Sequence, residues 1–275
     1  MKFAFSTLGL PGLPLAEVAR LAARHGYSGV ELRVHPEEPV HLGASGAARA
    51  EAAAMLRRAG VEIIGIAGYT QVAAPGDDHA VLAEIDALVR LAGDLGAGHV
   101  RVFPGGQEAP SPEEADDTAV RRLADAARLV GDARVRVLLE THDSHRRGTD
   151  VARVLDRVAD GRIGALWDVM HTWLGGECPG QSLTALTPHL GYVQVKDAAS
   201  TEDTTPLPLG EGALPLAECV TALSDQGFDG WLCWEYEKRW YKNAAPLPQL
   251  LADGRAYLDQ LLGERADVRG GPGEN

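Results

Sequence analysis

The sequence predicts a single α/β domain built as a closed (β/α)8 barrel. A short strand-like apolar run followed by an amphipathic stretch with helical periodicity recurs eight times along the chain. The 275 residues are 45% apolar, which is enough for one large core, and barrels of this kind commonly reach about 250 residues undivided. The barrel is expected to cover residues 1–263, and the Gly- and Pro-containing residues 264–275 are expected to form a disordered tail.

The expected strands are short apolar runs with a helical stretch between each and the next. They span Lys2–Thr7, Gly29–Val34, Glu62–Gly68, His99–Phe103, Arg136–His142, Gly164–Asp168, Tyr192–Lys196 and Trp231–Tyr236. Because strands joined through helices run parallel, their carboxyl ends are expected to meet on one face of the barrel.

The expected helices are amphipathic and rich in Ala, Leu and Arg. They span Pro14–His25, Gly46–Ala59, Asp78–Leu95, Pro112–Val130, Thr149–Val158, Gln181–His189, Leu214–Gln226 and Pro248–Leu262. Ser111 and Pro112 supply an N-cap and a first helical residue, and Gly96 follows the end of another helix. The stretch from Gln181 to His189 is short and contains Pro188, so its helical pattern is the weakest of the eight.

Charge and composition exclude several classes of protein. The formal net charge of −13 and a pI near 5.1 repel a phosphate backbone, and the densest basic cluster, His145 to Arg147, is too short to bind nucleic acid. Three cysteines without a CxxC pair indicate neither a disulfide framework nor a structural zinc site, which favours the reducing cytoplasm. No signal peptide and no apolar run of about 18 residues is present, so no membrane partner is expected.

Four polar residues close successive expected strands. They are Glu140, Asp168, Gln194 and Glu235. A single carboxylate at a strand end is usually solvated or caps a helix, whereas four at the ends of consecutive parallel strands predict one shared metal site.

Three carboxylates and an amide oxygen suit an octahedral Mg²⁺ or Mn²⁺ with open positions better than a closed zinc site. A substrate with a carbonyl next to a hydroxyl could chelate such an ion, which would stabilise the enediolate formed when a carbon-bound proton leaves. Glu140 or Glu235 would remove that proton. His171, which follows Asp168, is either a surface loop histidine or a substrate contact.

Period-2 geometry indicates which neighbours share a face with these four residues. His142 lies with Glu140, Lys196 with Gln194, and Glu237 with Glu235. Lys196 either pairs with Asp197 or Glu211 at the surface, or faces the barrel mouth and neutralises charge on a substrate oxygen.

Other polar and aromatic residues allow two interpretations. Glu31 shares a strand face with Arg33, and Arg101 shares one with Phe103; each pair is either an ion-pair layer inside the barrel or a contact to a polar substrate. Trp173 lies beside a ligand strand, where an aromatic side chain either packs its loop or stacks on a sugar. Trp240 is in the same position after the last strand.

Several stretches of the chain resemble a known family. They are LLETHDSH (Leu138–His145), WDVMH (Trp167–His171), YVQVKD (Tyr192–Asp197), LGEGALPL (Leu209–Leu216), GWLCWEYEKRW (Gly230–Trp240) and GYSGVELR (Gly26–Arg33). They resemble the sugar phosphate isomerase/epimerase group of the xylose isomerase-like TIM barrels over most of the chain.

The resemblance implies a TIM barrel with one divalent ion, Mn²⁺, Mg²⁺, Co²⁺ or Zn²⁺, bound by residues matching Glu140, Asp168, Gln194 and Glu235. It also implies that His171 touches the substrate. Many epimerases of the group carry His where this chain has Gln194. Gln occurs there in some relatives, including dehydratases acting on dehydroshikimate-type substrates, so two reaction classes stay open.

The leading functional hypothesis is a metal-dependent isomerase or epimerase of a sugar or sugar phosphate, with Glu140 and Glu235 as acid and base on opposite faces of the substrate. The expected contacts of this carbohydrate-like substrate are Lys196, His142, Glu31, Arg101 and Trp173, besides His171. The alternative is a lyase that dehydrates an oxo-polyol, an inosose or a dehydroshikimate, or cleaves a 3-oxo-glycoside, because its first proton abstraction is the same.

Two further classes are disfavoured. The apurinic endonuclease branch of the same barrel uses additional histidines, whereas this chain has Tyr69 and Phe103 near the corresponding strand ends. A non-catalytic sugar-binding module would need a broken ligand set, and here the set is complete. Assembly into a homo-oligomer stays open from the sequence.

Overall fold

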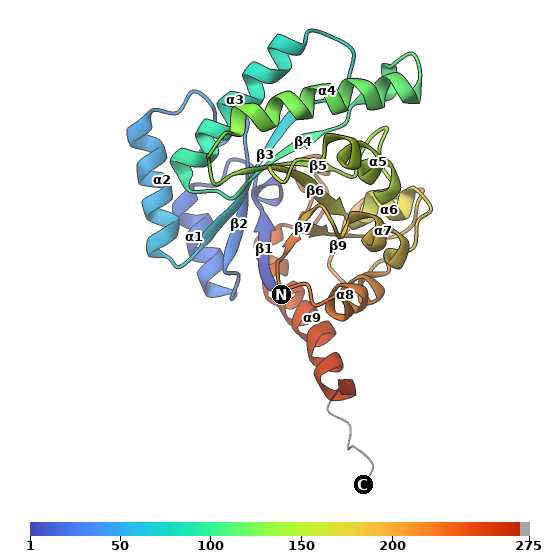
Figure 1. Ribbon diagram of the computed structural model, residues 1–275. Helices are drawn as coiled ribbons and strands as arrows, with labels where there is room; N and C mark the ends of the chain where they lie inside the picture. The colour runs from blue at the N-terminus through green and yellow to red at the C-terminus, as the bar shows by residue number, and fades with distance from the viewer. Residues whose placement is uncertain (270–275) are drawn as a thin grey trace.

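Eight parallel strands close into a barrel in the computed structural model, which describes residues 1–269 (Figure 1). The barrel strands are β1 (Lys2–Ser6), β2 (Gly29–Arg33), β3 (Glu62–Gln71), β4 (His99–Phe103), β5 (Arg136–Glu140), β6 (Ile163–Asp168), β7 (Leu190–Val195) and β10 (Trp231–Trp234). Around the barrel they follow chain order, and β10 closes it by pairing with β1 and β7. The prediction of a (β/α)8 TIM barrel is confirmed.

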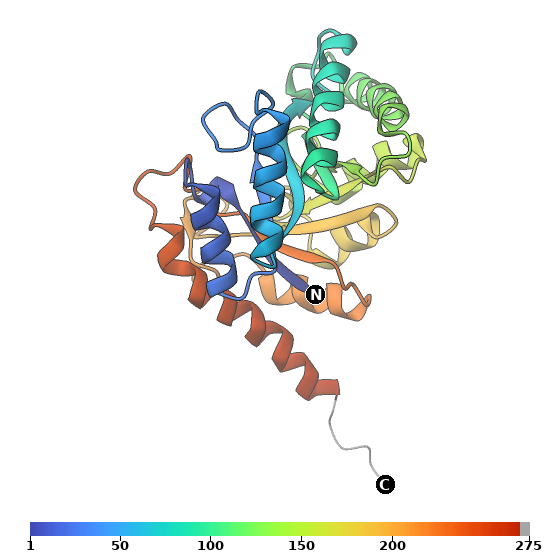
Figure 2. The ribbon, with the colours of Figure 1, turned by 90° about the vertical axis from the view of Figure 1, so that its left-hand side faces the viewer.

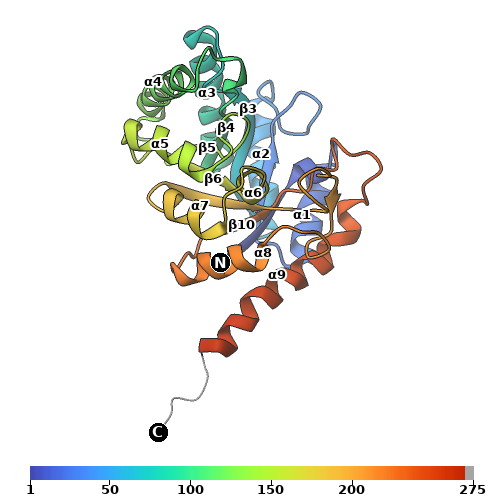
Figure 3. The same ribbon diagram turned by 90° about the vertical axis from the view of Figure 1, so that its right-hand side faces the viewer.

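Helices surround the barrel on its outer side, as three views a quarter-turn apart show (Figures 1, 2 and 3). They are α1 (Leu15–Arg24), α2 (Gly46–Arg58), α3 (Asp78–Leu95), α4 (Pro112–Val130), α5 (Gly148–Val158), α6 (Val169–Leu174), α7 (Pro179–Leu186), α8 (Leu216–Asp225) and α9 (Leu247–Arg269). Each expected helix is present, including the short one before β7. Its first residues are Pro179 and Gly180, and it ends at Leu186, before Pro188.

Helix α9 is longer than expected and extends past the body of the barrel (Figure 2). The barrel domain was predicted to end at Gly263, but the helix continues through Arg269. Residues 270–275 of the predicted tail lie outside the described residues. Among the described residues, no helix has the length and apolar character needed to cross a membrane.

A small apolar cluster plugs the interior of the barrel below the carboxyl ends of its strands. Its members are Ala4, Ile64, Leu138, Leu166, Tyr192, Trp231 and Cys233, all nearly or fully buried. Because side chains alternate along a strand, the next residue on the same face is polar: Glu140 follows Leu138, and Asp168 follows Leu166. The plug therefore supports a polar layer at the carboxyl end of the barrel, where barrels of this type carry their sites.

Glycines make room for the large side chains of this plug. A Cβ on Gly29 would come within 2.7 Å of both Ile64 and Trp231, and one on Gly65 would lie 3.1 Å from the hydroxyl of Tyr192. These glycines let bulky rings cross the interior without separating the strands.

Two elements after the strands were not predicted from the sequence. Helix α6 occupies part of a segment expected to be a loop, and Asp168 caps it, its Oδ1 accepting hydrogen bonds from the amides of Met170 (2.9 Å) and His171 (3.3 Å). Strands β8 (Asp197–Ala198) and β9 (Pro206–Leu207) form a short antiparallel hairpin after β7. Both elements lie at the carboxyl end of the barrel.

Candidate active site

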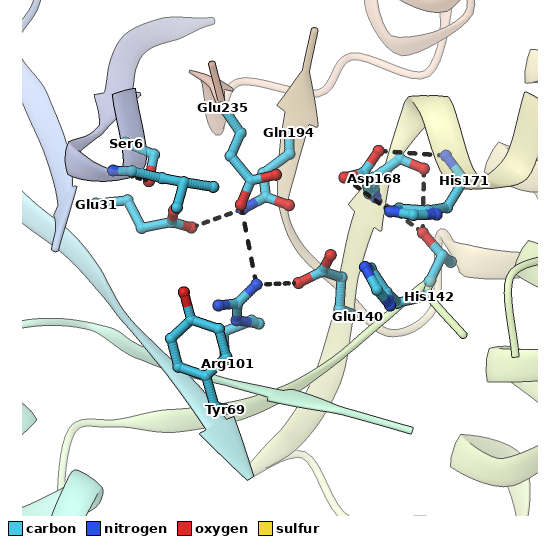
Figure 4. A network of polar contacts seen from close by, with 12 residues as sticks. Ser6, Glu31, Tyr69, Arg101, Glu140, His142, Asp168, His171, Gln194 and Glu235 are labelled. Atoms are coloured by element: carbon cyan, nitrogen blue, oxygen red, sulfur yellow. Dashed lines mark hydrogen bonds and ion pairs between the residues drawn. The ribbon is translucent and has the colours of Figure 1, made fainter. Parts of the chain in front are cut away.

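Buried polar side chains from six barrel strands converge above the plug (Figure 4). We call this group the charged chamber; it consists of Glu31, Arg101, Glu140, Asp168, Gln194, Lys196 and Glu235. None of these residues is more than 4% exposed, so each charge is largely removed from water and must be balanced by its neighbours.

Arg101 joins two of the predicted metal ligands. Its Nη1 donates to Oε2 of Glu140 at 2.7 Å and lies 3.9 Å from Oε1 of Glu235. The guanidinium also stacks on Phe103, 4.0 Å from the ring centroid. Arg101 is therefore an interior ion-pair residue, which is one of the two interpretations that the sequence allowed.

Gln194 connects the opposite side of the chamber. Its Nε2 donates to Oε2 of Glu31 at 2.9 Å and to Oε1 of Glu235 at 3.0 Å, whereas its Oε1 is buried without a hydrogen-bond partner. Tyr192, two residues earlier on the same face, donates its hydroxyl proton to the same oxygen of Glu31. The amide thus holds two carboxylates and leaves one acceptor oxygen free inside the chamber.

Lys196 faces the barrel interior and not the surface. Its Nζ lies 2.7 Å from Oδ2 of Asp168 and 2.9 Å from Oε1 of Glu237, and it also contacts Oε2 of Glu235. The alternative pairing with Asp197 is wrong, because that carboxylate accepts hydrogen bonds from the amides of Gly210 (2.8 Å) and Gly212 (3.0 Å). Lys196 therefore contacts the carboxylates of the chamber, whereas the next residue, Asp197, binds the loop that contains Gly210 and Gly212.

The chamber holds more negative than positive charge. Four buried carboxylates, those of Glu31, Glu140, Asp168 and Glu235, face two buried cations, Arg101 and Lys196, which leaves two negative charges unbalanced. Burial, reinforced by the charge of Glu235, raises the pKa of Glu31. Burial also raises the pKa of Glu140 to about 7, although Arg101 opposes this. A divalent cation is what such an imbalance would attract.

Two histidines line the more exposed edge of the chamber. The ring centroids of His142 and His171 are 3.9 Å apart, and Nδ1 of His142 lies 2.8 Å from Oδ1 of Asp143. Burial lowers the pKa of His142, but the hydrogen bond to Asp143 and the charge of Glu140 outweigh it and raise the pKa. Burial, with the charges of His142 and Lys196, puts the pKa of His171 well below its usual value, so its ring is neutral at pH 7.

The donor set fits a divalent cation in two adjoining positions. Oε1 of Gln194 is a buried oxygen that accepts no hydrogen bond, and Oδ2 of Asp168 is paired only with the ammonium of Lys196; both oxygens belong to the predicted ligand set. One ligand atom each from Glu140, His142 and His171 also lie within 4.8 Å of one another, which is a spacing that can hold a metal ion. The two positions share Glu140.

The structure brings together nearly all of the residues predicted for the site. Trp173 is the exception: it lies on α6, is half-buried and packs against the hydrophobic core, so a contact with substrate stays a prediction. Arg33 bonds to Glu38 and Tyr69 and not to Glu31, its neighbour on the strand. Sequence reasoning missed Tyr192, although its period-2 spacing from Gln194 placed it on the same face.

Comparison with known proteins agrees with this architecture. The family model described as xylose isomerase-like TIM barrel matches residues 19–261. The chain belongs to this family. The curated relatives compared below are an isomerase and an epimerase, so the chain is an enzyme of the xylose isomerase-like barrel family.

Two curated relatives cover most of the chain. The "Putative hydroxypyruvate isomerase" of Streptomyces coelicolor is 28% identical over 273 residues, covering 89% of this chain and 93% of the relative. Fructoselysine 3-epimerase of Shigella flexneri is 24% identical over 248 residues, covering 84% and 88% of the two chains.

Two solved structures share the fold of the xylose isomerase-like family. The probable 3-DHS dehydratase involved in petrobactin synthesis from Bacillus anthracis superposes with a TM-score of 0.77 at 19% identity, covering 94% of this chain and 99% of that one. The IOLI protein with a binding zinc atom gives a TM-score of 0.79 at 18% identity, with 96% and 99% coverage.

Proposed function

We propose that this barrel is a divalent-metal-dependent isomerase or epimerase that moves a proton next to the carbonyl of a sugar or sugar phosphate. The observation that carries the proposal is the charged chamber, in which four buried carboxylates face only two buried cations at the catalytic end of the barrel. The isomerase and epimerase named among the relatives support this class of reaction.

The ion would be held by the predicted set of Glu140, Asp168, Gln194 and Glu235. The buried Oε1 of Gln194 has no hydrogen-bond partner, which supports this position. When bound, a divalent ion such as Mn²⁺ or Mg²⁺, or alternatively Co²⁺ or Zn²⁺, supplies positive charge that makes a C–H bond beside a carbonyl more acidic.

Glu140 is suited to take that proton. Its pKa of about 7, raised by burial, lets its carboxylate accept a proton at neutral pH and give it back. The guanidinium of Arg101 holds Oε2 of Glu140 at 2.7 Å and so leaves Oε1 as the oxygen that meets the substrate. Glu235, held by Gln194 and Lys196, would serve the opposite face.

The remaining chamber residues would bind and orient the substrate. Lys196 stays protonated, since Asp168, Glu235 and Glu237 outweigh its desolvation and put its pKa well above the usual value. Its ammonium can therefore neutralise charge that develops on a substrate oxygen. His142 and His171 line the more exposed edge of the chamber, where their side chains are 27% and 16% exposed.

A lyase is the second candidate, and the paired histidines favour it. Elimination needs the same first proton abstraction and then an acid that protonates the departing hydroxyl or alkoxide. His142, with its raised pKa and its place beside Glu140, could supply that proton. The dehydratase among the structures with the same fold is in keeping with this alternative.

A screen for carbon-bound proton exchange tests the proposal. The protein would be reconstituted separately with Mn²⁺, Mg²⁺, Co²⁺ and Zn²⁺ in heavy water and offered ketoses, inososes, dehydroshikimate and 3-oxo-glycosides. Deuterium incorporation with the carbon skeleton and water content retained supports the isomerase, and incorporation with elimination supports the lyase. The Glu140→Gln variant serves as the inactive control. Absence of exchange with every ion and substrate would refute both reactions.

The partner is expected to be this small carbohydrate-like molecule alone. Absence of nucleic-acid and membrane partners and a cytoplasmic location remain predictions from the sequence, and assembly into a homo-oligomer stays open.

A further inference from the structure

A cavity lies beside the charged chamber at the same end of the barrel. It has a volume of about 530 Å³ and is lined by Arg33, His41, Leu42, Tyr69, Leu88 and Trp240, among others. We call it the rim pocket. Its lining comes from β2 and the loop after it, from β3, from α3 and from the loop after β10, so it lies beside the chamber and not under it. A volume of this size accommodates a small organic group besides the sugar-like part in the chamber.

Exposed apolar side chains concentrate in the rim pocket. Among the described residues, three large hydrophobic side chains are at least 36% exposed: Leu42, Leu129 and Trp240. Leu42 and Trp240 both line this cavity, and Trp240 is 54% exposed. Apolar surface gathered in a concave site favours an apolar ligand surface, because burying both removes them from water.

The guanidinium of Arg33 in the rim pocket is balanced by its neighbours. The guanidinium of Arg33 donates from Nη1 to Oε1 of Glu38 at 2.6 Å and from Nε to the hydroxyl of Tyr69 at 2.7 Å. It also lies 5.7 Å from the ring centroid of Trp240. Arg33 thus stiffens the aromatic wall, and its charge is neutralised by Glu38. With Arg33 neutralised and the carboxylate of Glu84 also in the lining, the pocket disfavours a phosphate or a carboxylate.

A continuous row of rings connects the rim pocket with the chamber. The ring of Tyr69, which lines the pocket, lies 5.9 Å from that of Phe103, and Phe103 lies 4.4 Å from His142. His142 in turn lies 3.9 Å from His171. Tyr69 also stands 5.5 Å from the guanidinium of Arg101 (Figure 4). One molecule could therefore lie along this wall with one end in each compartment.

We infer that the rim pocket is a second subsite that binds an uncharged ring attached to the sugar-like part of the substrate. This inference rests on the proposed function for the placement of the reacting end in the chamber. The shared chemistry is a flat apolar face, which an aromatic group and the face of a second sugar ring both offer to Trp240 and Tyr69.

Three probes that differ only in the attached group test this inference. Methyl β-D-glucoside, phenyl β-D-glucoside and methyl β-cellobioside would be titrated calorimetrically into the Mn²⁺-loaded protein. We expect the phenyl glucoside, the cellobioside or both to bind at least about tenfold more tightly than the methyl glucoside. Tighter binding of the phenyl glucoside would identify the attached group as aromatic, and tighter binding of the cellobioside would identify it as a sugar.

Variants of the two exposed side chains assign the preference to this pocket. Trp240→Ala should reduce it to within about twofold, and Leu42→Ala should reduce it partly. Leu129→Ala, which removes an exposed side chain of α4 that does not line the pocket, should leave it unchanged. Equal affinity for all three probes, or a preference that Trp240→Ala does not alter, would overturn the inference. So would a change of oligomeric state in Trp240→Ala, measured by light scattering, because it would make the pocket an interface between copies.

The subsite and the reaction can fail separately. Proton exchange on small ketoses without any ring preference would retain the reaction and exclude the subsite. A ring preference that depends on Trp240, found without proton exchange on any substrate, would retain the subsite and exclude the reaction.

Discussion

Nζ of Lys196 lies 2.7 Å from Oδ2 of Asp168 and contacts Glu235 from the same position. Asp168 and Glu235, two of the four predicted metal ligands, therefore already contact one cation, the ammonium of Lys196. A divalent ion bound by the predicted set would share these oxygens with Lys196 and would be repelled by its charge.

Replacing Lys196 should therefore strengthen ion binding while weakening the reaction. In Lys196→Met, we expect Mn²⁺ affinity to rise at least about tenfold, because a positive charge a few ångströms from the ion is removed. Proton exchange should fall, since the substrate oxygen loses its cation. Competition against a chromophoric chelator measures the affinity.

Lys2→Met is the matched control, because Lys2 lies at the amino end of β1, on the opposite face of the barrel. Unchanged or weaker Mn²⁺ affinity in Lys196→Met would mean that no ion binds next to Asp168 and Glu235.

One variant in each of the two adjoining ion positions shows which position the ion occupies. If the ion is held by the predicted set, Gln194→Ala should weaken its binding by about 10–100-fold. His171→Ala should keep the affinity within about threefold yet lose proton exchange, because it removes a substrate contact. The reverse pattern in chelator competition would place the ion between Glu140, His142 and His171.

The framework of this site could be predicted because it depends on local patterns. Period-2 alternation placed Gln194 and Lys196 on one strand face, and the order of strands around a parallel barrel then brought Glu140 and Glu235 to the same end. The structure bears out both, with Arg101 and Lys196 lying between the carboxylates.

The partners of these residues could not be predicted, because they depend on side-chain direction across the barrel. The sequence offered Asp197 and Glu211 as surface partners of Lys196, and only the closed barrel shows that its ammonium contacts Asp168, Glu235 and Glu237 instead. The pairing of Arg33 with Glu38 was missed for the same reason: Glu38 lies in a loop whose path no periodic pattern describes. Helix α6 was missed because its six residues are too short to show helical periodicity.

Asp197 is expected to hold the loop between β9 and α8. Its buried carboxylate accepts hydrogen bonds from the amides of Gly210, Gly212 and Leu214, at 2.8, 3.0 and 3.2 Å. Asp197→Ala would leave these amides without that acceptor, so we expect the free energy of unfolding to fall by about 3 kcal/mol. Urea denaturation measures the change, and limited proteolysis should show earlier cleavage between residues 199 and 214.

Asp203→Ala in the same loop is the control for Asp197, since Asp203 is exposed. Its effect should stay below about 0.5 kcal/mol. Equal effects of the two substitutions would mean that the buried carboxylate does not organise the loop.

Asp78 should make the stability of the fold depend on pH in the acid range. The hydrogen bond from Arg121, with a second from Arg122, lowers the pKa of this carboxyl from 3.8 to about 2. Arg122 is buried and also donates to the carbonyls of Ala74 (2.7 Å) and Gly76 (2.9 Å), so the contact ties α4 to the loop before α3. Because the folded-state pKa lies below the unfolded one, the carboxylate stabilises the fold above about pH 4, and this contribution disappears as the pH falls towards 2.

Urea denaturation of the wild-type protein and Asp78→Asn between pH 7 and pH 2 tests this dependence. The wild-type protein should be the more stable at pH 7, and the difference should shrink as the pH falls through the window between 4 and 2. Asp253→Asn, on an exposed position of α9, controls for the loss of one negative charge. A difference between wild type and Asp78→Asn that is constant across the whole range would show that the ion pairs with Arg121 and Arg122 contribute nothing to folding.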